Sequence, residues 1–321
     1  MDDEHRKGAI ITRSWLPPWA STLTAVGILA TLVLWLGARP FLAALDSISL
    51  AAVVAALVIT AGTTWACAQR WSLLADRLGV GLPIRDAYRA YYRAQFLNAT
   101  LPTGVVGEVD RAVWHGRSSR AMSRGIRSVV WDRATGQLVL FGLAVLAIPA
   151  LPSSLRFWML WSLAAAAAAL LGIRASRSTL LQAAWAEARV VPGARSVRTS
   201  ILGLSVLAAA GHVAVFIVAS RSVGVTVGLA DLVPLALIVL LISAIPLGVA
   251  GWGPREGGAA LVFGMAGLNA GTGLAVAVTY GVLSTCATLP GIFALRRRRA
   301  TPGTTTNPEG GPSWATAPTR S

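Results

Sequence analysis

The chain has 321 residues, of which 55% are hydrophobic and only 13% charged, and its mean hydropathy is +0.64. Its long apolar runs do not alternate polar and apolar faces as a soluble core helix does, so the composition excludes a soluble globular protein. The net charge is +15, almost all of it from arginine, because Lys7 is the only lysine. The arginines lie between apolar runs, where the positive-inside rule and anionic lipids explain them better than nucleic-acid binding does.

The sequence predicts an all-α, polytopic membrane protein. A polar segment, residues 1–19, comes first, and the apolar run after it is long for a signal peptide, so we expect an uncleaved first helix. A transmembrane domain is expected over residues 20–295, followed over residues 296–321 by a basic stop and a disordered tail. Six clear spans are predicted at residues 20–38, 48–67, 129–150, 157–173, 200–220 and 273–294.

Two further apolar segments are broken, which brings the total to as many as eight spans by hydropathy. Residues 94–107 are apolar but too short to cross a bilayer, and Pro102, Gly104 and Gly107 interrupt any regular helix there. Basic blocks flank this segment on both sides. We therefore expect it to enter the membrane and return to the same side, covered by protein or by a wet cavity.

The second broken segment lies within residues 231–269. Its centre runs Pro246-Leu-Gly248-Val-Ala-Gly251-Trp-Gly253-Pro254-Arg255-Glu256. Both breaks read Pro-x-Gly-Val-x-Gly, and in both a glutamate close to an arginine comes next. Broken segments at corresponding places in two halves indicate the binding site of a transporter. The sequence leaves open whether residues 231–269 form a full transmembrane hairpin or a re-entrant one. Either form returns the chain to the side of the membrane from which it entered.

Arginine content alternates between the connecting segments, and this alternation predicts the orientation. Segments with a single arginine belong outside the cell, and strongly basic ones belong in the cytoplasm. Both termini are therefore expected in the cytoplasm, with the chain in the inner membrane. The single-arginine loops are residues 39–47, 151–156 and 221–230, and the basic segments are residues 68–128, 174–199 and 296–299.

The residues around the two breaks and at the start of the third span are the candidate substrate-binding residues. Arginine forks match the geometry of phosphate oxygens, and free N–H groups where a helix restarts would add to such a site. The glutamates would hold the arginines or meet a cationic group of the substrate. Structural ion pairs near the interface are the alternative. The candidates are Asn98, Pro102, Gly104, Gly107, Glu108, Arg111, Asp132, Arg133, Pro246, Gly251, Gly253, Arg255 and Glu256.

Other chemistry finds little support in the sequence. It contains no paired metal ligands, no Ser-His-Asp set, no Walker loop and no glycine-rich nucleotide motif after a strand. We therefore expect no enzymatic activity, no metal and no cofactor. His212 lies within a span and is a functional candidate for that reason, although a hydrogen bond to a neighbouring helix is an equal alternative.

Three of these features together resemble the lysylphosphatidylglycerol synthase transmembrane family, which is flippase-like. They are Asn98…Leu101-Pro102-x-Gly104-x-x-Gly107-Glu108-x-x-Arg111, then Asp132-Arg133, then Pro246-x-Gly248-x-x-Gly251-x-Gly253-x-Arg255-Glu256. The family more often has glutamate where Asp132 stands. The resemblance covers roughly residues 20–295 and implies an inner-membrane protein related to the part of aminoacyl-phosphatidylglycerol synthases that moves lipid between leaflets. The soluble aminoacyltransferase domain of those proteins is not expected in this chain.

The function expected from the sequence is therefore translocation or binding of a lipid with a charged headgroup, through a polar cavity within the membrane. The lipid would be an anionic phospholipid or a polyprenyl-phosphate-linked lipid, and a separate synthase or glycosyltransferase is a candidate partner. The alternative is a membrane-embedded transferase, or an assembly subunit of a lipid-linked glycan or aminoacyl-lipid pathway. The sequence predicts no nucleic-acid partner and does not define an oligomeric state.

Overall fold

The computed structural model describes residues 37–101, 105–175, 195–245 and 252–295, with a few isolated positions between residues 27 and 34. Several predictions fall outside these residues. They concern most of the first span and of the basic segment 174–199, the C-terminal tail, and the motif residues Pro102, Gly104, Pro246 and Gly251.

The described part of the chain consists of α-helices and two short 3₁₀ helices, so the all-α prediction is confirmed. The α-helices are α2 (Arg39–Asp46), α3 (Leu50–Arg77), α4 (Ile84–Thr100), α5 (Val106–Ser118), α6 (Met122–Leu146), α7 (Ser153–Ala175), α9 (Arg195–Ser222), α10 (Leu229–Ser243), α11 (Pro254–Met265) and α12 (Ala270–Thr288). The 3₁₀ helices are η2 (Ile148–Ala150) and η3 (Leu289–Ala294).

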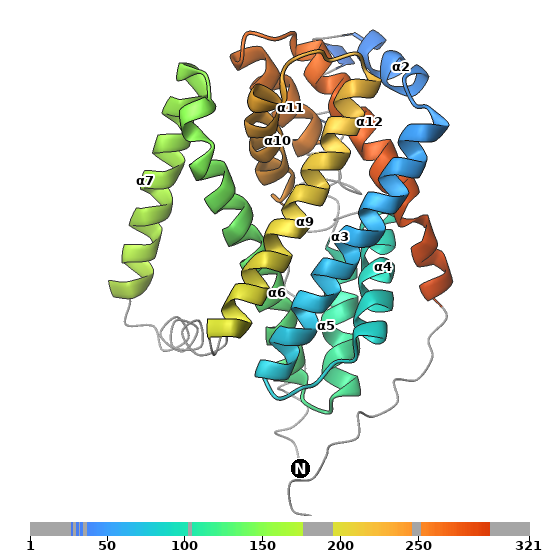
Figure 1. Ribbon diagram of the computed structural model, residues 1–321, viewed down its shortest axis with the longest axis vertical. Helices are drawn as coiled ribbons and strands as arrows, with labels where there is room; N and C mark the ends of the chain where they lie inside the picture. Colours follow the sequence, from blue (N-terminus) through green and yellow to red (C-terminus); the bar gives the residue numbers. More distant parts are fainter. Residues whose placement is uncertain are drawn as a thin grey trace, which may run out of the picture.

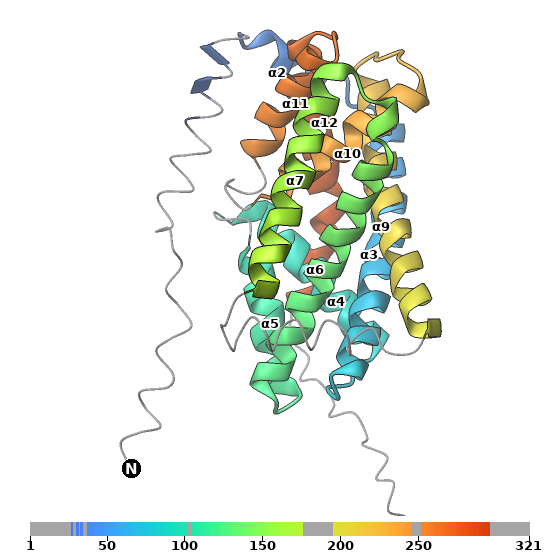
Figure 2. The ribbon, with the colours of Figure 1, turned by 90° about the vertical axis from the view of Figure 1, so that its left-hand side faces the viewer.

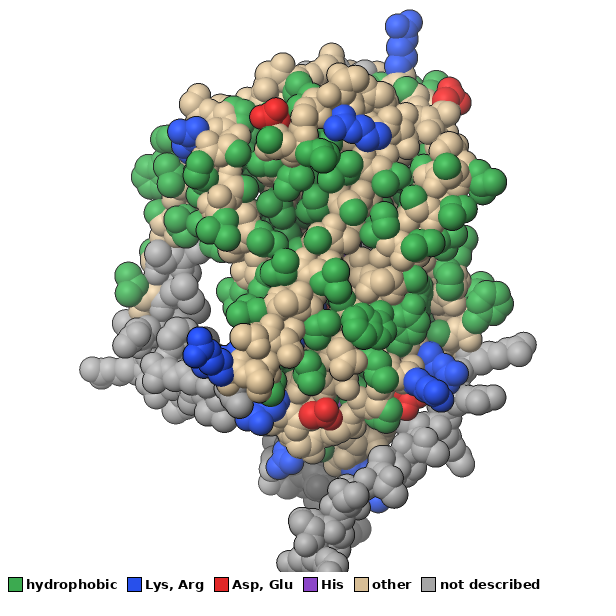
Figure 3. Space-filling view, in the orientation of Figure 1, with side chains coloured by type: hydrophobic (Ala, Val, Ile, Leu, Met, Phe, Trp, Pro, Cys, Tyr) green, Lys and Arg blue, Asp and Glu red, His purple; other side chains and the backbone are tan. Residues whose placement is uncertain are grey.

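Four helices among the described residues are long and apolar enough to cross a bilayer: α3, α6, α9, and α12 continued by η3. Their outer faces carry exposed hydrophobic side chains, which water would not favour. Figure 3 shows hydrophobic side chains over the middle of one face, with charged side chains gathered towards its two ends. This distribution is the one that a hydrocarbon layer between two aqueous phases selects.

Two of these helices extend beyond the limits that hydropathy predicted. α3 continues past residue 67 to Arg77, and α6 begins at Met122 rather than at residue 129. The apolar count ended each span at its first charged side chains. On α3, Arg70 is buried and pairs with Asp132, so that helix carries it into the interior. On α6, Arg124 and Arg127 are exposed, so that helix continues past the apolar span with charged side chains on its surface.

Close backbone approach joins the long helices. A Cβ atom added at Gly211 of α9 would lie 2.0 Å from the Oγ1 atom of Thr63 on α3. Small residues at such crossings bring two backbones together where the hydrophobic effect between lipid-embedded helices is weak. Ser49 starts α3 by accepting a hydrogen bond at its Oγ atom from the amide of Ala52, at 3.1 Å.

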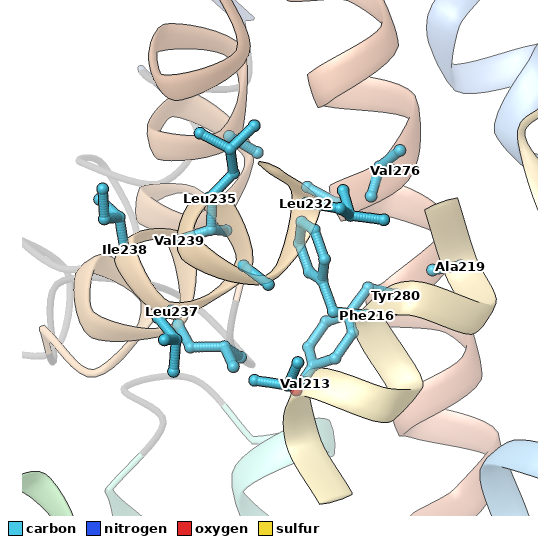
Figure 4. Close-up of a cluster of buried hydrophobic side chains, with 14 of the residues drawn as sticks. Val213, Phe216, Ala219, Leu232, Leu235, Leu237, Ile238, Val239, Val276 and Tyr280 are labelled. Atoms are coloured by element: carbon cyan, nitrogen blue, oxygen red, sulfur yellow. The ribbon is translucent and has the colours of Figure 1, made fainter. Parts of the chain in front are cut away.

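The main hydrophobic core lies at the other end of the bundle from the basic segments. Phe216 of α9 is fully buried there, and its ring centroid lies 5.9 Å from that of Tyr280 on α12. Figure 4 shows Phe216 with Leu232 of α10 beside it. This packing fixes α10 against α9 and α12.

The two broken segments form two short pairs of helices that enter the bundle from opposite ends. α4 and α5 lie in the lower half, and α10 and α11 lie in the upper half, in both Figure 1 and Figure 2. The long helices α3, α6 and α9 pass through both halves. The two short pairs therefore lie at opposite ends of the bundle formed by the long helices.

The first pair is more helical than the sequence indicated. The sequence predicts an irregular apolar dip over residues 94–107, but α4 runs from Ile84 to Thr100 and α5 begins at Val106, so most of this segment is helical. The two helices are antiparallel, since Arg93 of α4 pairs with Asp110 of α5. Gly107 enables the approach, because a Cβ atom there would lie 2.1 Å from the carbonyl oxygen of Ala94.

The second pair restarts through glycine and proline. Gly253 has φ +112°, a conformation that only glycine adopts readily, and Pro254 follows as the first residue of α11. The amide of Gly253 donates a 2.6 Å hydrogen bond to the Glu256 carboxylate. α11 therefore begins at a fixed point, three residues before a buried acid.

The antiparallel geometry of α4 and α5 predicts that Arg89 and Arg117 lie on the same side of the membrane. Single cysteines at these positions, in a protein whose Cys67 and Cys286 are replaced by alanine, should react with an impermeant maleimide from one side only. A cysteine at Asp231, at the start of α10, should react from the other side. Labelling of positions 89 and 117 from opposite sides would show that the chain between them crosses the membrane once, and would contradict the antiparallel pair.

Gly107→Ala is expected to push α4 and α5 apart, because its Cβ atom would overlap the Ala94 carbonyl. The cost should be about 1–3 kcal/mol of unfolding free energy, as for other overpacked sites. Gly142→Ala on α6 is the matched control, since nothing lies within 4 Å of a Cβ atom there. The free energy of unfolding of both variants can be measured in mixed micelles. Equal values would contradict the close approach of α4 and α5 at Gly107.

Candidate functional site

A polar cavity of about 300 Å³ lies at the centre of the bundle, where the first helix pair meets the long helices. Helices α3, α4, α5, α6, α9, α10 and α12 all contribute to its wall. Its charged and polar lining consists of Arg70, Tyr91, Gln95, Glu108, Arg111, Asp132, Arg133, Gln137, Ser205, His212, Ser243 and Tyr280, and Cys67 also lines it. Such a concentration of polar groups within apolar helices makes the cavity the candidate functional site.

Asp132 of α6 is the most deeply buried charge of the cavity, with an exposed fraction of 0%. Its Oδ1 atom lies 2.8 Å from Nε of Arg70, and its Oδ2 atom lies 3.1 Å from Nη2 of Arg111. The Tyr91 hydroxyl also donates to Oδ2. One carboxylate thus serves two arginines from two other helices, which leaves positive charge in excess at this point.

Arg111 carries that excess. Its guanidinium lies between two aromatic rings, 4.6 Å from the centroid of Trp71 and 4.0 Å from that of Tyr91. The side chain is 3% exposed, and its Nε and Nη1 atoms have no hydrogen-bond partner among the described residues. Buried donors without partners are costly, so these two atoms are candidates for contact with an acceptor from outside the chain.

A second ion pair occupies the more open part of the cavity. Arg133 of α6 lies next to Asp132 in the sequence, but its Nη1 atom contacts Glu108 of α5 at 2.5 Å. The side chains of Arg133 and Glu108 are 39% and 24% exposed, whereas those of Arg70 and Asp132 are 5% and 0% exposed. Asp132 and Arg133 therefore belong to two separate networks, one deep and fixed and one accessible.

Asn98 joins the accessible pair to the tip of the first helix pair. Its Nδ2 atom donates to Glu108 at 2.8 Å, and its Oδ1 atom accepts a 2.7 Å hydrogen bond from the amide of Gly107. The amide of Gly107 lies at the beginning of α5 and would otherwise lack a partner within its helix. Asn98 thus orients Glu108, and through it Arg133.

The second break has its own buried ion pair. Arg255 donates from Nε and Nη2 to the same oxygen of Glu256, at 2.9 and 2.6 Å. Its guanidinium also lies 5.2 Å from the ring centroid of Trp252 and 5.5 Å from that of Tyr280. Gly281 of α12 leaves room for it, because a Cβ atom there would lie 2.2 Å from Nη2 of Arg255.

The structure brings together only part of the predicted site. Asn98, Gly107, Glu108, Arg111, Asp132 and Arg133 form one constellation at the cavity. Gly253, Arg255 and Glu256 form a second cluster and are not among the described residues that line the cavity. Tyr280 connects the two, since it lines the cavity and also faces Arg255. His212, the within-span candidate, does line the cavity.

Sequence reasoning missed Arg70 and Tyr91. Arg70 lies in the segment 68–128 that is predicted to be basic and cytoplasmic, yet it and Tyr91 both bind Asp132 inside the bundle. The signal for Arg70 was its position, because Arg70-Trp71 follows directly on an apolar run without any glycine or proline to end the helix. His115 was also placed in a basic loop, but it lies in α5 and is 1% exposed beside Trp71.

Long apolar helices around a buried polar cavity, with hydrophobic side chains outside, define a multi-pass membrane protein. The family model described as "Lysylphosphatidylglycerol synthase TM region" matches residues 22–291, and the chain therefore belongs to that family. Neither the comparison with curated proteins nor that with solved structures gives a match. The family places the protein in a lipid-related pathway.

Asp132→Asn should destabilise the protein strongly, because it leaves Arg70 and Arg111 buried without a counter-charge. Removal of one partner from a buried pair costs about 3–5 kcal/mol. Asp46→Asn on exposed α2 is the matched control and should change stability by less than about 0.5 kcal/mol. The free energy of unfolding of both variants can be measured in mixed micelles. A similar loss of stability in the two variants would contradict the central role of Asp132.

Proposed function

We propose that the protein binds a lipid by its charged headgroup in the central cavity and moves it between the two leaflets of the inner membrane. One observation carries this proposal. Arg111 is buried against two aromatic rings, and its Nε and Nη1 atoms have no hydrogen-bond partner among the described residues, in a cavity that a ligand of headgroup size could enter. An anionic headgroup would supply the missing acceptors, and arginine's planar fork suits the oxygens of a phosphate.

The two short helix pairs support a transport role. We propose that both are re-entrant, α4 and α5 from the cytoplasmic side and α10 and α11 from the outside. Their tips would then meet near the middle of the membrane, where broken helices commonly form the substrate site of a transporter. Movement of one pair relative to the long helices would open the cavity to one leaflet at a time.

The distribution of arginine supports the orientation. The segments of sequence at the lower ends of α3, α5 and α9 carry many arginines, whereas the upper ends of α2, α7 and α9 carry one each, Arg39, Arg156 and Arg221. Positive residues remain on the cytoplasmic side of inner-membrane proteins. We therefore propose that both termini lie in the cytoplasm.

The two ion pairs of the cavity would have different roles. The fixed network of Arg70, Asp132 and Tyr91 would hold Arg111 in place, while the accessible Glu108–Arg133 pair would exchange Glu108 for the headgroup. Arg255 would act as a positioning residue for α11 and Tyr280 rather than as a direct ligand of the lipid. No covalent chemistry is part of this proposal.

Arg111→Lys tests the site with the positive charge retained. The ammonium group can still pair with Asp132, but it lacks the fork and the flat stacking surface of arginine. Transfer of a fluorescent anionic phospholipid between the leaflets of liposomes should fall by about tenfold or more, because hydrogen bonds to charged groups contribute about 1.5–3 kcal/mol each.

Arg156→Lys, on the exposed start of α7, is the matched control and should transfer lipid at the wild-type rate. A folded Arg111→Lys protein that also retained the wild-type rate would contradict the assignment of the cavity. If the wild type moved no lipid of any class, the alternatives of a membrane-embedded transferase or an assembly subunit for a separate synthase or glycosyltransferase would replace transport.

A further inference from the structure

A second hollow lies between α4, α5 and η3, and we call it the α4–η3 groove. Its volume is about 610 Å³, and in the described part of the chain it shares no lining residue with the central cavity. Figure 1 shows η3, in red after α12, beside α4 in the lower half of the bundle. The two elements are in close contact, because a Cβ atom at Gly291 of η3 would lie 2.3 Å from the carbonyl oxygen of Tyr92 on α4. The groove is therefore a separate feature, and its two walls are fixed against each other.

One wall of the groove belongs to the end of a membrane span. The apolar stretch Ala270–Ala294, which joins α12 and η3, is long enough to cross a bilayer, and its last residues line the groove. Leu289, Ile292 and Phe293 of η3 are 50%, 49% and 84% exposed. Apolar side chains on the surface of a span are covered by acyl chains. A lipid beside η3 would therefore have an acyl chain in contact with this wall.

The opposite wall carries aromatic side chains. Tyr88 and Tyr92 of α4 and Trp114 of α5 line the groove, and the ring centroids of the two tyrosines lie 5.1 Å apart. Tyrosine and tryptophan are enriched at the headgroup level of a membrane, because their rings are amphipathic. The groove is therefore placed at the level of the glycerol and phosphate of a phospholipid, in the leaflet at the arginine-rich end of the bundle.

Two opposite charges on α4 line the groove. Asp86 and Arg89 are three positions apart, so they are neighbours on the helix surface, with about 5–6 Å between their Cβ atoms. Neither side chain has an ion pair or a hydrogen bond with any described residue. Arg93 is the third charged residue of the lining, and it pairs with Asp110 of α5, which compensates its charge within the protein. The described groove thus presents one cation and one anion to a ligand.

A zwitterionic headgroup complements these two charges. The planar fork of Arg89 suits phosphate oxygens, and an ammonium group can donate to the carboxylate of Asp86. In an ethanolamine headgroup a short two-carbon link joins phosphate and ammonium, which fits neighbouring positions on a helix surface. A headgroup with a phosphate and no ammonium would bring a second negative charge close to Asp86. We infer that the α4–η3 groove binds a zwitterionic phospholipid, with its phosphate at Arg89, its ammonium group at Asp86 and an acyl chain along η3.

Photo-cross-linking can locate this lipid and rank its competitors. The full-length protein in mixed micelles would receive phosphatidylethanolamine with a photoreactive diazirine on one acyl chain, close to the glycerol, and mass spectrometry would identify the labelled peptides. We expect label on η3. Unlabelled phosphatidylethanolamine should displace this label at about fivefold lower concentration than phosphatidylglycerol does, because only phosphatidylethanolamine can pair with Asp86.

The same measurement on the wild type can overturn the inference. Equal displacement by the two lipids would do so, and better displacement by phosphatidylglycerol would assign the groove to an anionic lipid instead. Label on η3 that neither lipid displaces would also overturn it and would leave the groove to a protein segment. Transfer between leaflets plays no part in this measurement, so the inference and the proposed function can fail separately.

Asp86→Asn separates lipid recognition from a structural role of this residue. The variant keeps the phosphate contact at Arg89 but loses the charge that attracts ammonium, so displacement by the two lipids should become equal to within about twofold. Asp231→Asn is the matched control, since Asp231 also lies in the first turn of its helix, α10, and is not among the described residues that line the groove. A preference retained by folded Asp86→Asn protein would overturn the inference.

Arg89→Gln removes the fork that would hold the phosphate. Displacement by both lipids should then require about fivefold higher concentrations, because both carry the same phosphate. Arg85→Gln should behave as the wild type, since Arg85 is also exposed on α4 but is not among the described residues of the lining. Wild-type displacement by both lipids in the Arg89→Gln protein would contradict the phosphate site and overturn the inference.

Discussion

The pairing of one carboxylate with two arginines is the interaction on which the centre of this protein depends. Asp132 is fully buried, and Arg70 and Arg111 reach it from α3 and α5. Without it, two guanidinium groups would be buried with no counter-charge, and neither helix could remain in its place. The same pairing leaves one positive charge over, so the group that holds three helices together also prepares the site for an anion.

The glycines of the two breaks are explained by what lies next to them. Gly107 allows α5 to approach the backbone of α4, and Gly253 adopts the positive φ from which α11 starts. At both places a glutamate follows within three residues and receives an amide or side-chain donor from its own break. The matching sequence of the two breaks therefore reflects a shared structural role. Each break separates two helices and fixes the position of a glutamate at the start of the second one.

The sequence predicted the membrane fold and much of the site, because the relevant signals are local. Apolar runs indicate long helices, and the spacing of Asn98, Gly107, Glu108 and Arg111 places them around one helix start. It did not predict Arg70 as a cavity residue. Its partner is 62 positions away in the chain, and no periodicity reveals such a contact. The limits of α3 were misjudged for the same reason, since hydropathy treats an arginine as exposed unless its partner is known.

The separation of the charged residues into three groups explains how one cavity can be both stable and able to exchange its ligand. The Asp132 network is almost completely buried and fixed by several helices, and the Arg255–Glu256 pair is buried at the opposite helix pair. Only Glu108 and Arg133 are partly exposed. A buried pair costs several kcal/mol to separate, whereas a partly exposed one costs about 1 kcal/mol or less. In the proposed function, an entering anion would displace Glu108 from Arg133 while the contacts that hold the helices together stay intact.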